Sequence, residues 1–518
     1  MNEFLKNLKN EFNFTETENG AGALKSTNNA VLDAFGSLGA MKDAPDSQIT
    51  LTFEKAFEEN KDLALRLWFY IRDCRGGQGM RRVFRVISKW LAEFHPRYVI
   101  ANLPNFLEYG RSDDLLYAFA PRTRQSIYKF IATQIDEDLT GMRNGKSISL
   151  LAKWLPSENT SSPRTRAIAR DIRINLKMTP RQYRKILSAL RSHINIVEQK
   201  MSKNRWQDIK YDTVPGKAHL NYRKAFARHD YNRYSRYLTT GKINATALFP
   251  VDIVHQALRL PSGDTLSREM LDKMWKSLPN YLEGREETGI CVVDTSGSMS
   301  GTPIEVALSL GMYCADKCRG PFKGHFITFS ARPQLQSIIG ADIYSKVQNM
   351  ERANWDSNTN LEAVFDLILQ TAVSAHLKDK DMPKKLYIIS DMQFDAATTE
   401  YYYDFSNRYA KTKTRNSGLT FMRQMRAKYE SYGYTMPAIV YWNVRASDKG
   451  MFQETVNGEN CAMVSGYSPS LFKSVIDGTT VEYTMENGKI QKKETIDPIN
   501  VMLTALMDER YDKVVTEL

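Results

Sequence analysis

The stretch GICVVDTSGSMSGTP, residues 289–303, decides the fold. Its first six residues form an apolar run without alternation, which is typical of a strand buried on both faces. Small polar residues follow at once, and Pro303 suits the first turn of a helix. The stretch therefore predicts a buried strand that ends at Asp294, then a turn rich in hydroxyl groups, then a helix.

Similar apolar runs recur downstream and alternate with helical patterns. The strand-like runs are HFITF (325–329), KLYIIS (385–390), AIVYWNV (438–444) and CAMV (461–464), and the helical patterns lie at 303–318, 361–373 and 416–430. Buried strands that alternate with helices predict a doubly wound, mostly parallel, Rossmann-like α/β domain over residues 284–480. Ligands of such sheets bind at the carboxyl ends of the strands, so the residues directly after each run matter most.

Upstream, from residue 51 to about 260, helical periodicity dominates. The segment LALRLWFYIRDCRGG stops at a glycine pair, and the helical segment MRRVFRVISKWLAEF follows at once. Similar segments continue with scarcely a strand pattern among them, which favours stacked helical hairpins over a compact bundle. We expect a helical domain over residues 51–283, preceded by a polar, Asn/Gly-rich and loosely attached arm over residues 1–50.

Composition excludes several classes of protein. The chain has 518 residues, 42% of them hydrophobic and 25% charged, which is typical of a globular protein with two or three domains. No apolar run is long enough to span a membrane, and the N-terminus lacks the pattern of a secretory signal. The five cysteines are odd in number and scattered, which favours reduced thiols. We therefore expect a cytoplasmic protein; a zinc site at Cys314 and Cys318 is disfavoured because no second ligand pair stands at a suitable spacing.

The net charge of +12 is concentrated in one stretch. Residues 161–242 hold 20 Lys and Arg against five Asp and Glu, a balance of +15 that leaves about −3 for the rest of the chain. Concentrated positive charge indicates a polyanionic partner. Within this stretch the candidate phosphate-binding residues are Arg181, Arg184, Lys185, Lys203, Arg205, Lys210, Arg223, Lys224, Arg228, Arg233 and Arg236.

Aromatic residues are interleaved with these cations: Tyr183, Trp206, Tyr211, Tyr222, Phe226, Tyr231, Tyr234 and Tyr237. Two interpretations fit. Cations that neutralise phosphates beside rings that stack on unpaired bases indicate binding of single-stranded or end-splayed RNA. Alternatively, the aromatics belong to the helix core and the charges to a solvated face. A second basic segment, RDCRGGQGMRR (72–82), is either a structural turn or a phosphate contact through its arginines; its glycines follow a helix, which disfavours a nucleotide-binding loop.

The turn after the first strand carries Asp294, Ser296 and Ser298 in a DxSxS pattern. Such hard oxygen ligands suit Mg²⁺ most, with Mn²⁺ as an alternative. The pattern resembles the metal-ion-dependent adhesion site of von Willebrand factor A domains. That resemblance implies a further threonine and a further aspartate as ligands, and Thr359 and Asp391 stand at the matching places, with Asp395 and Asp356 as acids that could support them.

Other readings of this turn remain open. A Ser or Asp there can simply cap the following helix. The pattern GxSxG would make Ser300 a nucleophile, but no suitably placed histidine follows it. A metal-dependent nuclease or hydrolase usually has carboxylates that bridge the ions, whereas this site is rich in hydroxyls. We therefore expect no enzymatic activity.

The helical half has a resemblance of its own. The segments YGRSDDLL, KAHLNYRKAFARHDYNRYSRYL and the terminal IDPINVMLTALMDERYDKV are similar to a cytosolic family that joins a TROVE-like helical-repeat module to a von Willebrand A domain, the architecture of the Ro autoantigen. The resemblance implies HEAT-like repeats in a ring or arc that binds structured or misfolded RNA, and a C-terminal helical tail (481–518) that packs back on the helical domain. The expected function is RNA binding, with the A domain recruiting a partner or closing the ring. The rival is a scaffold that docks an acidic residue of a protein partner through its metal.

Overall fold

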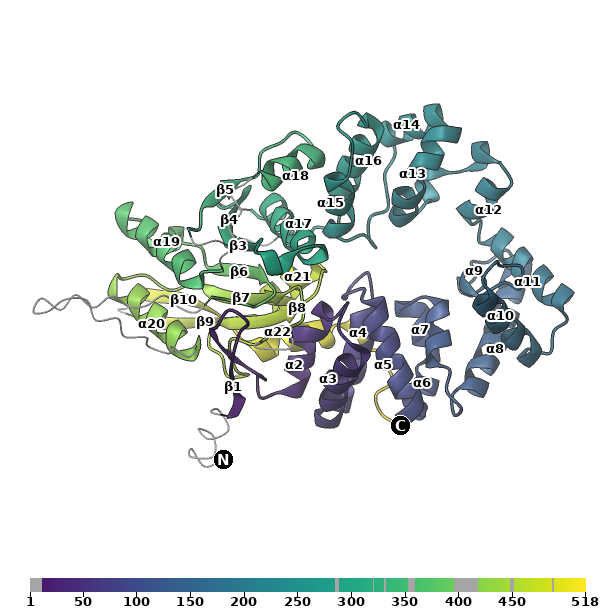
Figure 1. Cartoon of the computed structure of the whole chain (residues 1–518), viewed down its shortest axis with the longest axis horizontal. Coiled ribbons are helices and arrows are strands. Elements are labelled where there is room, and N and C mark those ends of the chain that lie inside the picture. The colour runs from purple at the N-terminus through teal and green to yellow at the C-terminus, as the bar shows by residue number, and fades with distance from the viewer. Residues whose placement is uncertain are drawn as a thin grey trace, which may run out of the picture. The chain divides into compact units, whose positions relative to one another are not determined.

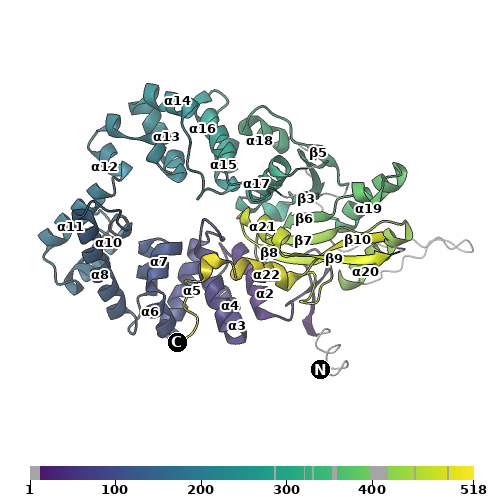
Figure 2. The ribbon, with the colours of Figure 1, turned by 180° about the vertical axis from the view of Figure 1, so that it is seen from behind.

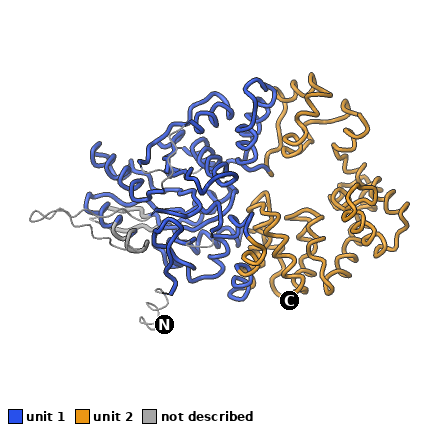
Figure 3. The backbone as a smooth tube through the Cα atoms, in the orientation of Figure 1, with its two compact units in different colours: residues 1–44, 52–60, 248–508 blue, residues 45–51, 61–247, 509–518 orange. Residues whose placement is uncertain are grey.

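The protein is described here by a computed structural model, which places residues 12–284, 288–319, 321–329, 332–352, 359–395, 418–447, 451–486 and 489–518. The chain forms two compact units, coloured separately in Figure 3. Unit 1 consists of residues 1–44, 52–60 and 248–508, and unit 2 consists of residues 45–51, 61–247 and 509–518. Unit 1 contains a central sheet and unit 2 is helical, so the chain combines an α-helical part with an α/β part.

The sheet of unit 1 has six strands in the order β5-β4-β3-β6-β7-β8 (Figure 1). Its members are β3 (Gly289–Asp294), β4 (His325–Phe329), β5 (Leu335–Ser337), β6 (Lys385–Ser390), β7 (Ala438–Asn443) and β8 (Cys461–Ser465). All neighbours pair in parallel except β5, which runs antiparallel to β4 at the edge. Apart from β5, the strands follow a doubly wound order. From β3 the chain moves outward to β4, then returns to the other side of β3 and continues through β6, β7 and β8.

The predicted strands of this sheet are confirmed. Every residue of β3, β6 and β7 is buried, which explains why their sequences are apolar without alternation. The structure also contains β5, which sequence patterns did not indicate. Its three residues, Leu-Gln-Ser, are exposed or half-buried and carry no periodicity.

Helices cover both faces of the sheet. On one face lie α17 (Thr302–Lys317) and α21 (Ser470–Asp477). Gly311 of α17 lies so close to the sheet that an added Cβ would come within 2.5 Å of the Val293 side chain. On the opposite face α2 (Ala30–Ser37) packs against β8, where Gly36 lies beside Met463.

The N-terminal segment differs from the loosely attached arm expected from its composition. From residue 12 to residue 44 it belongs to unit 1, as the hairpin of β1 (Phe14–Glu16) and β2 (Gly22–Leu24) followed by α2. Phe35 and Leu32 of α2 are buried, and the Ser465 hydroxyl donates a hydrogen bond to the Phe35 carbonyl oxygen at 2.7 Å. The apolar residues among 31–35 of this otherwise polar segment are thus part of the core.

The boundary between the units also lies elsewhere than residue 283. Helices α15 (Pro250–Leu258) and α16 (Thr265–Lys276) belong to unit 1, where they pack on α17 and α18 (Ile343–Glu351). Ion pairs fix them there: Arg259 with Glu305, and Arg268 with Asp342, at 2.8 and 2.7 Å. The other helices of unit 1 are α19 (Leu361–Ser374), α20 (Gly418–Ser431) and α22 (Pro498–Leu506).

The C-terminal region is only partly helical, unlike the predicted tail. Strands β9 (Thr479–Glu486) and β10 (Lys489–Ile496) form an antiparallel hairpin before α22. The last residues, 509–518, belong to unit 2, where Arg510 and Tyr511 bind Asp73.

Unit 2 is built from helices that pack mainly on their neighbours in sequence, and Figure 2 shows them from behind. They are α4 (Lys61–Arg72), α5 (Arg81–Phe94), α6 (Pro96–Ala101), α7 (Leu103–Tyr109), η2 (Ser112–Ala118), α8 (Arg124–Arg143), α9 (Leu151–Trp154), α10 (Pro163–Asn175), α11 (Pro180–His193), α12 (Val197–Ser202), α13 (Gly216–His229) and α14 (Tyr231–Thr240). Helix α3 (Asp46–Glu59) has residues in both units. Stacked aromatic rings, among them Trp68 and Phe84 at 5.5 Å, fill the core between α4 and α5.

The structure also bears on the predictions about the cysteines and about membrane-spanning segments. None of the five cysteines forms a disulfide, in line with the expectation of reduced thiols. Within the part of the chain that is described, no helix is both long and apolar enough to cross a membrane.

Candidate functional site

Asp294 ends β3 and is fully buried. Its Oδ1 accepts a hydrogen bond from the backbone N–H of Ser296 at 2.9 Å, and its Oδ2 accepts one from the Ser390 hydroxyl at 2.5 Å. Ser390 is the last residue of β6, the parallel neighbour of β3. The carboxylate is therefore held at the carboxyl ends of two strands that flank the point where the strand order reverses, which is where doubly wound sheets bind ligands.

The turn after β3 brings two hydroxyls together. The Oγ atoms of Ser296 and Ser298 lie 3.0 Å apart, on either side of Gly297 in the short 3₁₀ turn Gly297–Met299. The guanidinium of Arg445 donates to the carbonyl oxygen of Ser298. The neighbouring Ser300 hydroxyl instead donates to the Gly297 carbonyl oxygen at 2.7 Å, so it serves the turn rather than the cluster.

Asp391, the residue after β6, adds a second buried carboxylate with 2% of its surface exposed. Its Oδ1 accepts from the backbone N–H of Gln393 at 3.2 Å. Burial raises the pKa of Asp391, whereas a hydrogen bond from Ser298 and the charge of Arg445 lower it. Burial, together with the charge of Asp391, also raises the pKa of Asp294 to about 6. Two carboxylates thus share one desolvated site.

Thr359 is fully buried beside the loop that follows β6. Its hydroxyl donates to the Gln393 carbonyl oxygen at 3.0 Å, and its backbone N–H donates to Asp395 Oδ2 at 2.8 Å. The predicted residue is therefore joined to Asp391 through Gln393, and Asp395 is the acid that holds it. Asp356 lies outside the described residues.

The N-terminal segment supplies residues that sequence reasoning missed. Thr17 donates to the Phe394 carbonyl oxygen at 2.7 Å, and the backbone N–H of Glu18 donates to Gln393 Oε1 at 2.6 Å. The Glu18 carboxylate accepts from the Ser447 hydroxyl at 2.9 Å, and its charge raises the pKa of Asp391. Nothing in the sequence indicates this contact, because it joins residues more than 370 positions apart.

The donor set fits a hard divalent cation. Among the described residues no three His, Cys, Asp or Glu side chains gather in a geometry suited to a metal. The cluster has two acids, Asp294 and Asp391, and its other side-chain donors are hydroxyls; Mg²⁺ is typically bound by one or two carboxylates and completes its shell with neutral oxygens. Two buried carboxylates raise each other's pKa unless positive charge lies between them, and a bound cation would supply that charge.

The basic stretch of unit 2 lies largely at the surface. Ten of its eleven candidate cations are exposed, and Arg223 is half-buried. Of these eleven cations, only Arg205 and Arg233 form ion pairs with residues that the structure describes, namely Asp208 and Asp230. Arg233 also donates to the carbonyl oxygens of Ile209 and Trp206, so it holds the local fold as well.

Four of the eight aromatic residues of the same stretch lie inside, which favours the interpretation that the aromatics belong to the helix core. Tyr183, Tyr211, Phe226 and Tyr234 expose 4% or less of their surface. Several surround the buried His219, whose ring stacks on Tyr234 and Tyr237. Trp206 is half-buried against His229, and only Tyr231, 56% exposed, is open to solvent. The spacing of three to four residues thus places the aromatics on the buried faces of these helices and the cations on their exposed faces.

Comparison with known proteins places the chain in a family. The family described as Domain of unknown function (DUF2828) matches residues 17–113 and 125–288, just over half of the chain. A second family, described as Domain of unknown function (DUF7788), matches residues 288–506. An uncharacterized protein of Acanthamoeba polyphaga mimivirus is similar as well: it is 31% identical over 512 residues, which cover 90% of this chain and 85% of the relative. The chain belongs to the DUF2828 family.

In this DUF2828 protein the two matched regions meet at residue 288, immediately before β3. The candidate metal site draws on both. Asp294, Ser298 and Asp391 lie in the DUF7788 match, whereas Glu18 lies at the start of the DUF2828 match. The N-terminal segment of the DUF2828 region is therefore part of the site carried by the DUF7788 region.

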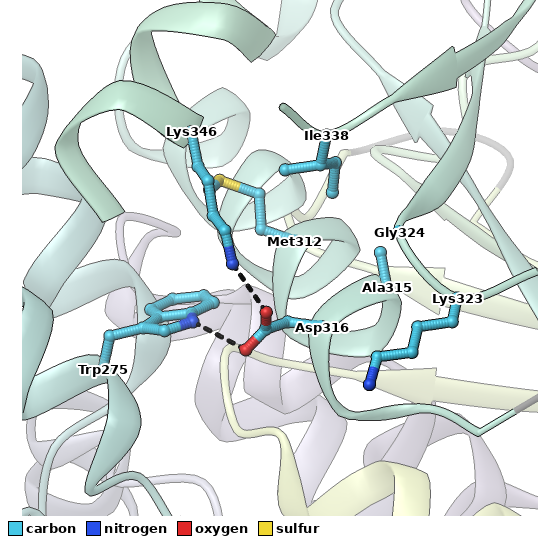
Figure 4. Close-up of a pocket in the computed structure, with 8 residues that line it drawn as sticks. All are labelled: Trp275, Met312, Ala315, Asp316, Lys323, Gly324, Ile338 and Lys346. Atoms are coloured by element: carbon cyan, nitrogen blue, oxygen red, sulfur yellow. Dashed lines mark hydrogen bonds and ion pairs between the residues drawn. The ribbon is translucent and has the colours of Figure 1, made fainter. Parts of the chain in front are cut away.

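A small cavity of about 60 Å³ lies elsewhere in unit 1 of the DUF2828 protein, between α16, α17 and α18 (Figure 4). Three of its polar groups bind one another: Asp316 accepts hydrogen bonds from Lys346 Nζ at 2.7 Å and from Trp275 Nε1 at 3.1 Å. The volume has room for a few water molecules. This cavity is consistent with a role in packing.

Proposed function

We propose that this protein binds RNA through the basic surface of its helical unit, without catalysing a reaction. The observation that carries the proposal is the exposure of ten cations along residues 181–236 with very few acids to neutralise them. Such a surface attracts the phosphates of a nucleic acid and releases their counterions. Because four of the eight aromatics are buried and only Tyr231 is exposed, phosphate contacts rather than base stacking are the main source of affinity.

Unit 1 is proposed to be a von Willebrand factor A-type domain that binds Mg²⁺ through Asp294, Ser296, Ser298, Thr359 and Asp391. The strand order and the position of the acids beside the reversal point support this assignment. A bound Mg²⁺ would offer a coordination position to a carboxylate or phosphate oxygen of a partner. The helices of unit 2 are proposed to be HEAT-like repeats of the TROVE type, because they pack mainly on their sequence neighbours.

The test of RNA binding is charge reversal at residues that have no structural role of their own. Lys224 and Arg228 lie one turn apart on α13, and Arg236 lies on α14; all three are exposed. The triple variant Lys224→Glu, Arg228→Glu and Arg236→Glu is expected to abolish binding of a single-stranded RNA. Arg233 is left in place because it holds backbone carbonyl oxygens.

The control reverses three exposed cations of unit 2 outside the basic stretch: Lys89→Glu, Arg97→Glu and Arg122→Glu. It has the same net charge as the test variant, so it separates a local surface from a general charge effect. Wild-type affinity is expected to fall steeply with salt, with a log–log slope of about −0.7 per phosphate contact. Equal loss in both variants, or binding that salt does not weaken, would contradict the proposal.

A second candidate function is docking of an acidic protein partner at the metal. One contact favours it: the Glu18 carboxylate already lies near Asp391, so this face of the site accommodates a carboxylate of the chain itself. An acidic peptide that binds only when Mg²⁺ is present, and more tightly to Glu18→Ala, would support docking. If RNA binding is lost in the triple variant while such a peptide fails to bind, RNA is the partner.

A further inference from the structure

Five cations and two acids meet in unit 2, outside the basic stretch. We call this group the Arg81 cluster: Arg72, Arg81, Arg85, Arg111, Lys153, Asp113 and Asp114. It is assembled from α4, α5, η2 and α9, and these elements pack on one another. With seven charged side chains, five of them positive, the cluster has a net charge of +3.

The two acids of the cluster are fully used by three of its arginines. Asp114, which is completely buried, accepts from Arg72 Nε at 2.7 Å and from Arg85 Nε at 2.6 Å. Asp113 accepts two hydrogen bonds from Arg111, at 2.9 and 2.6 Å, and one from Arg85 at 2.8 Å. No carboxylate of the cluster is left for a fourth arginine.

Arg81 is that fourth arginine. Its guanidinium has no hydrogen bond or ion pair with any residue that the structure describes. Partial burial, together with the charges of Arg111, Arg72 and Arg85, lowers its pKa, whereas the charge of Asp114 raises it. Its neighbour Arg82 differs, because it pairs with Asp46. Arg81 is exposed, so a ligand from solvent can reach it.

Further positive potential surrounds this arginine. The Arg111 guanidinium stacks on the Trp154 ring at 3.7 Å, and Lys153 Nζ lies 5.3 Å from the same ring. Helix α5, 14 residues long, begins at Arg81 with no side-chain cap at Met80 and no acid in its first turn. No acidic side chain in the first turn neutralises the positive end of the helix dipole, so this end adds to the positive potential of the cluster.

We propose that the Arg81 cluster binds a phosphate group, with Arg81 as its principal ligand. Phosphate fits better than a single carboxylate because it brings up to two negative charges and several acceptor oxygens to a site with an excess of three positive charges. The phosphate can come from an RNA strand, in which case the site deepens the proposed function, or from a small phosphorylated molecule, in which case it is independent of it.

The test uses the full chain and inorganic phosphate as the probe, at constant ionic strength with chloride as the reference. Phosphate is expected to raise the unfolding midpoint of the wild type, because a ligand of the folded state stabilises it. Arg81→Gln is expected to weaken phosphate binding at least roughly ten-fold. Arg82→Gln removes the same charge from the same helical turn, but from an arginine that already has an acid partner, and should keep the phosphate response.

The same variants separate a ligand-binding role from a structural one. Without phosphate, Arg81→Gln is expected to unfold at the same or a higher temperature than the wild type, because it removes a charge that its neighbours repel. A purely structural Arg81 would instead lower the midpoint with and without phosphate, which would overturn the proposal. A wild type that responds no more to phosphate than to chloride would overturn it as well.

A final arm identifies the source of the phosphate. If it is RNA, Arg81→Gln also weakens binding of a single-stranded RNA and inorganic phosphate competes with that RNA. If it is a small molecule, the phosphate response is lost while RNA affinity is unchanged. Because the first arm contains no RNA, failure of the Lys224, Arg228 and Arg236 test leaves this proposal standing, and the reverse also holds.

Discussion

Ser390 at the end of β6 donates its hydroxyl to Oδ2 of Asp294 at the end of β3, over 2.5 Å. This bond joins two parallel neighbours at their carboxyl ends and leaves the next residue, Asp391, beside the same pocket of polar groups. Two buried acids are costly to ionise together, and Arg445 is the cation that acts on Asp391. A further positive charge at this edge of the sheet would therefore stabilise the ionised form of both acids.

The first prediction concerns metal binding. Mg²⁺ is expected to raise the unfolding midpoint of the wild type and to leave that of Asp294→Asn unchanged, because the variant lacks a charged ligand. Ser300→Ala, whose hydroxyl binds the turn instead, should keep the response. Thermal unfolding with Mg²⁺ and with a chelator measures the difference. A wild type that does not respond to Mg²⁺ or Mn²⁺ would contradict the proposed site.

The same aspartate should make metal-free stability depend on pH. Its pKa is about 6 in the folded protein and 3.8 ordinarily, so between these values the folded state holds more protons than the unfolded chain. Stability without metal is therefore expected to fall as pH rises from about 4 to 6, by at most about 3 kcal/mol. In Asp294→Asn this fall should be smaller, as urea unfolding at several pH values would show.

A third prediction concerns Glu18, whose negative charge acts on Asp391. Glu18→Gln is expected to weaken Mg²⁺ binding roughly three-fold, because one charge near the cation is lost in a solvent-exposed position. Glu16→Gln makes the same chemical change two residues away, in strand β1. Isothermal titration of both variants measures the effect. Equal affinities would show that Glu18 contributes no charge to the site.

How much of this could be read from the sequence differs between parts of the fold. Strands β3, β6 and β7 are buried on both faces, so their composition alone marks them. Strand β5 carries no such pattern. Helix α2 was hidden because polar residues surround its short apolar patch, and composition averaged over fifty residues does not reveal which few of them reach the core.

The site shows the same division. Asp294, Ser296 and Ser298 are neighbours in sequence, and Asp391 follows a recognisable strand, so their position at one edge of the sheet could be predicted. Glu18 could not, because its place depends on the path of the whole chain around the sheet. In unit 2 a spacing of three to four residues fits both stacked bases and a helix core, and only burial distinguishes the two: Tyr234 lies inside and Tyr231 outside.

A fourth prediction concerns His219, which is fully buried on α13. Its Nε2 lies 3.1 Å from the Tyr211 carbonyl oxygen, and burial lowers its pKa to about 4. Between pH 6.5 and 4 the unfolded chain takes up a proton that the folded protein does not. Stability of unit 2 should therefore fall as pH decreases through this window, by about 3 kcal/mol.

The variant His219→Phe keeps a ring in this core but cannot titrate. It is expected to start from lower stability, because the Tyr211 carbonyl oxygen loses its donor, and then to show a shallower dependence on pH. Urea unfolding from pH 4 to 7, followed by a probe in unit 2, measures both effects. Parallel pH profiles for the two proteins would show that His219 is not the titrating group.

The last prediction concerns the C-terminal residues of unit 2. Asp73 exposes 1% of its side chain and accepts hydrogen bonds from Arg510 and from the Tyr511 hydroxyl, the latter at 3.2 Å. Arg510→Gln leaves this buried carboxylate without its cation, and since Arg510 is itself 29% exposed we expect a loss of about 2 to 3 kcal/mol of unfolding free energy. Urea unfolding of unit 2 measures it.

Lys513→Gln is the matched control in the same segment. Lys513 pairs with Glu108 at 3.4 Å, and both side chains are well exposed, so the loss should stay below about 1 kcal/mol. The double variant Asp73→Asn, Arg510→Gln tests the cause. If the cost of Arg510→Gln comes from the stranded carboxylate, it should largely disappear once Asp73 is neutral; an unchanged cost in that background would mean that Arg510 stabilises unit 2 by packing instead of by charge.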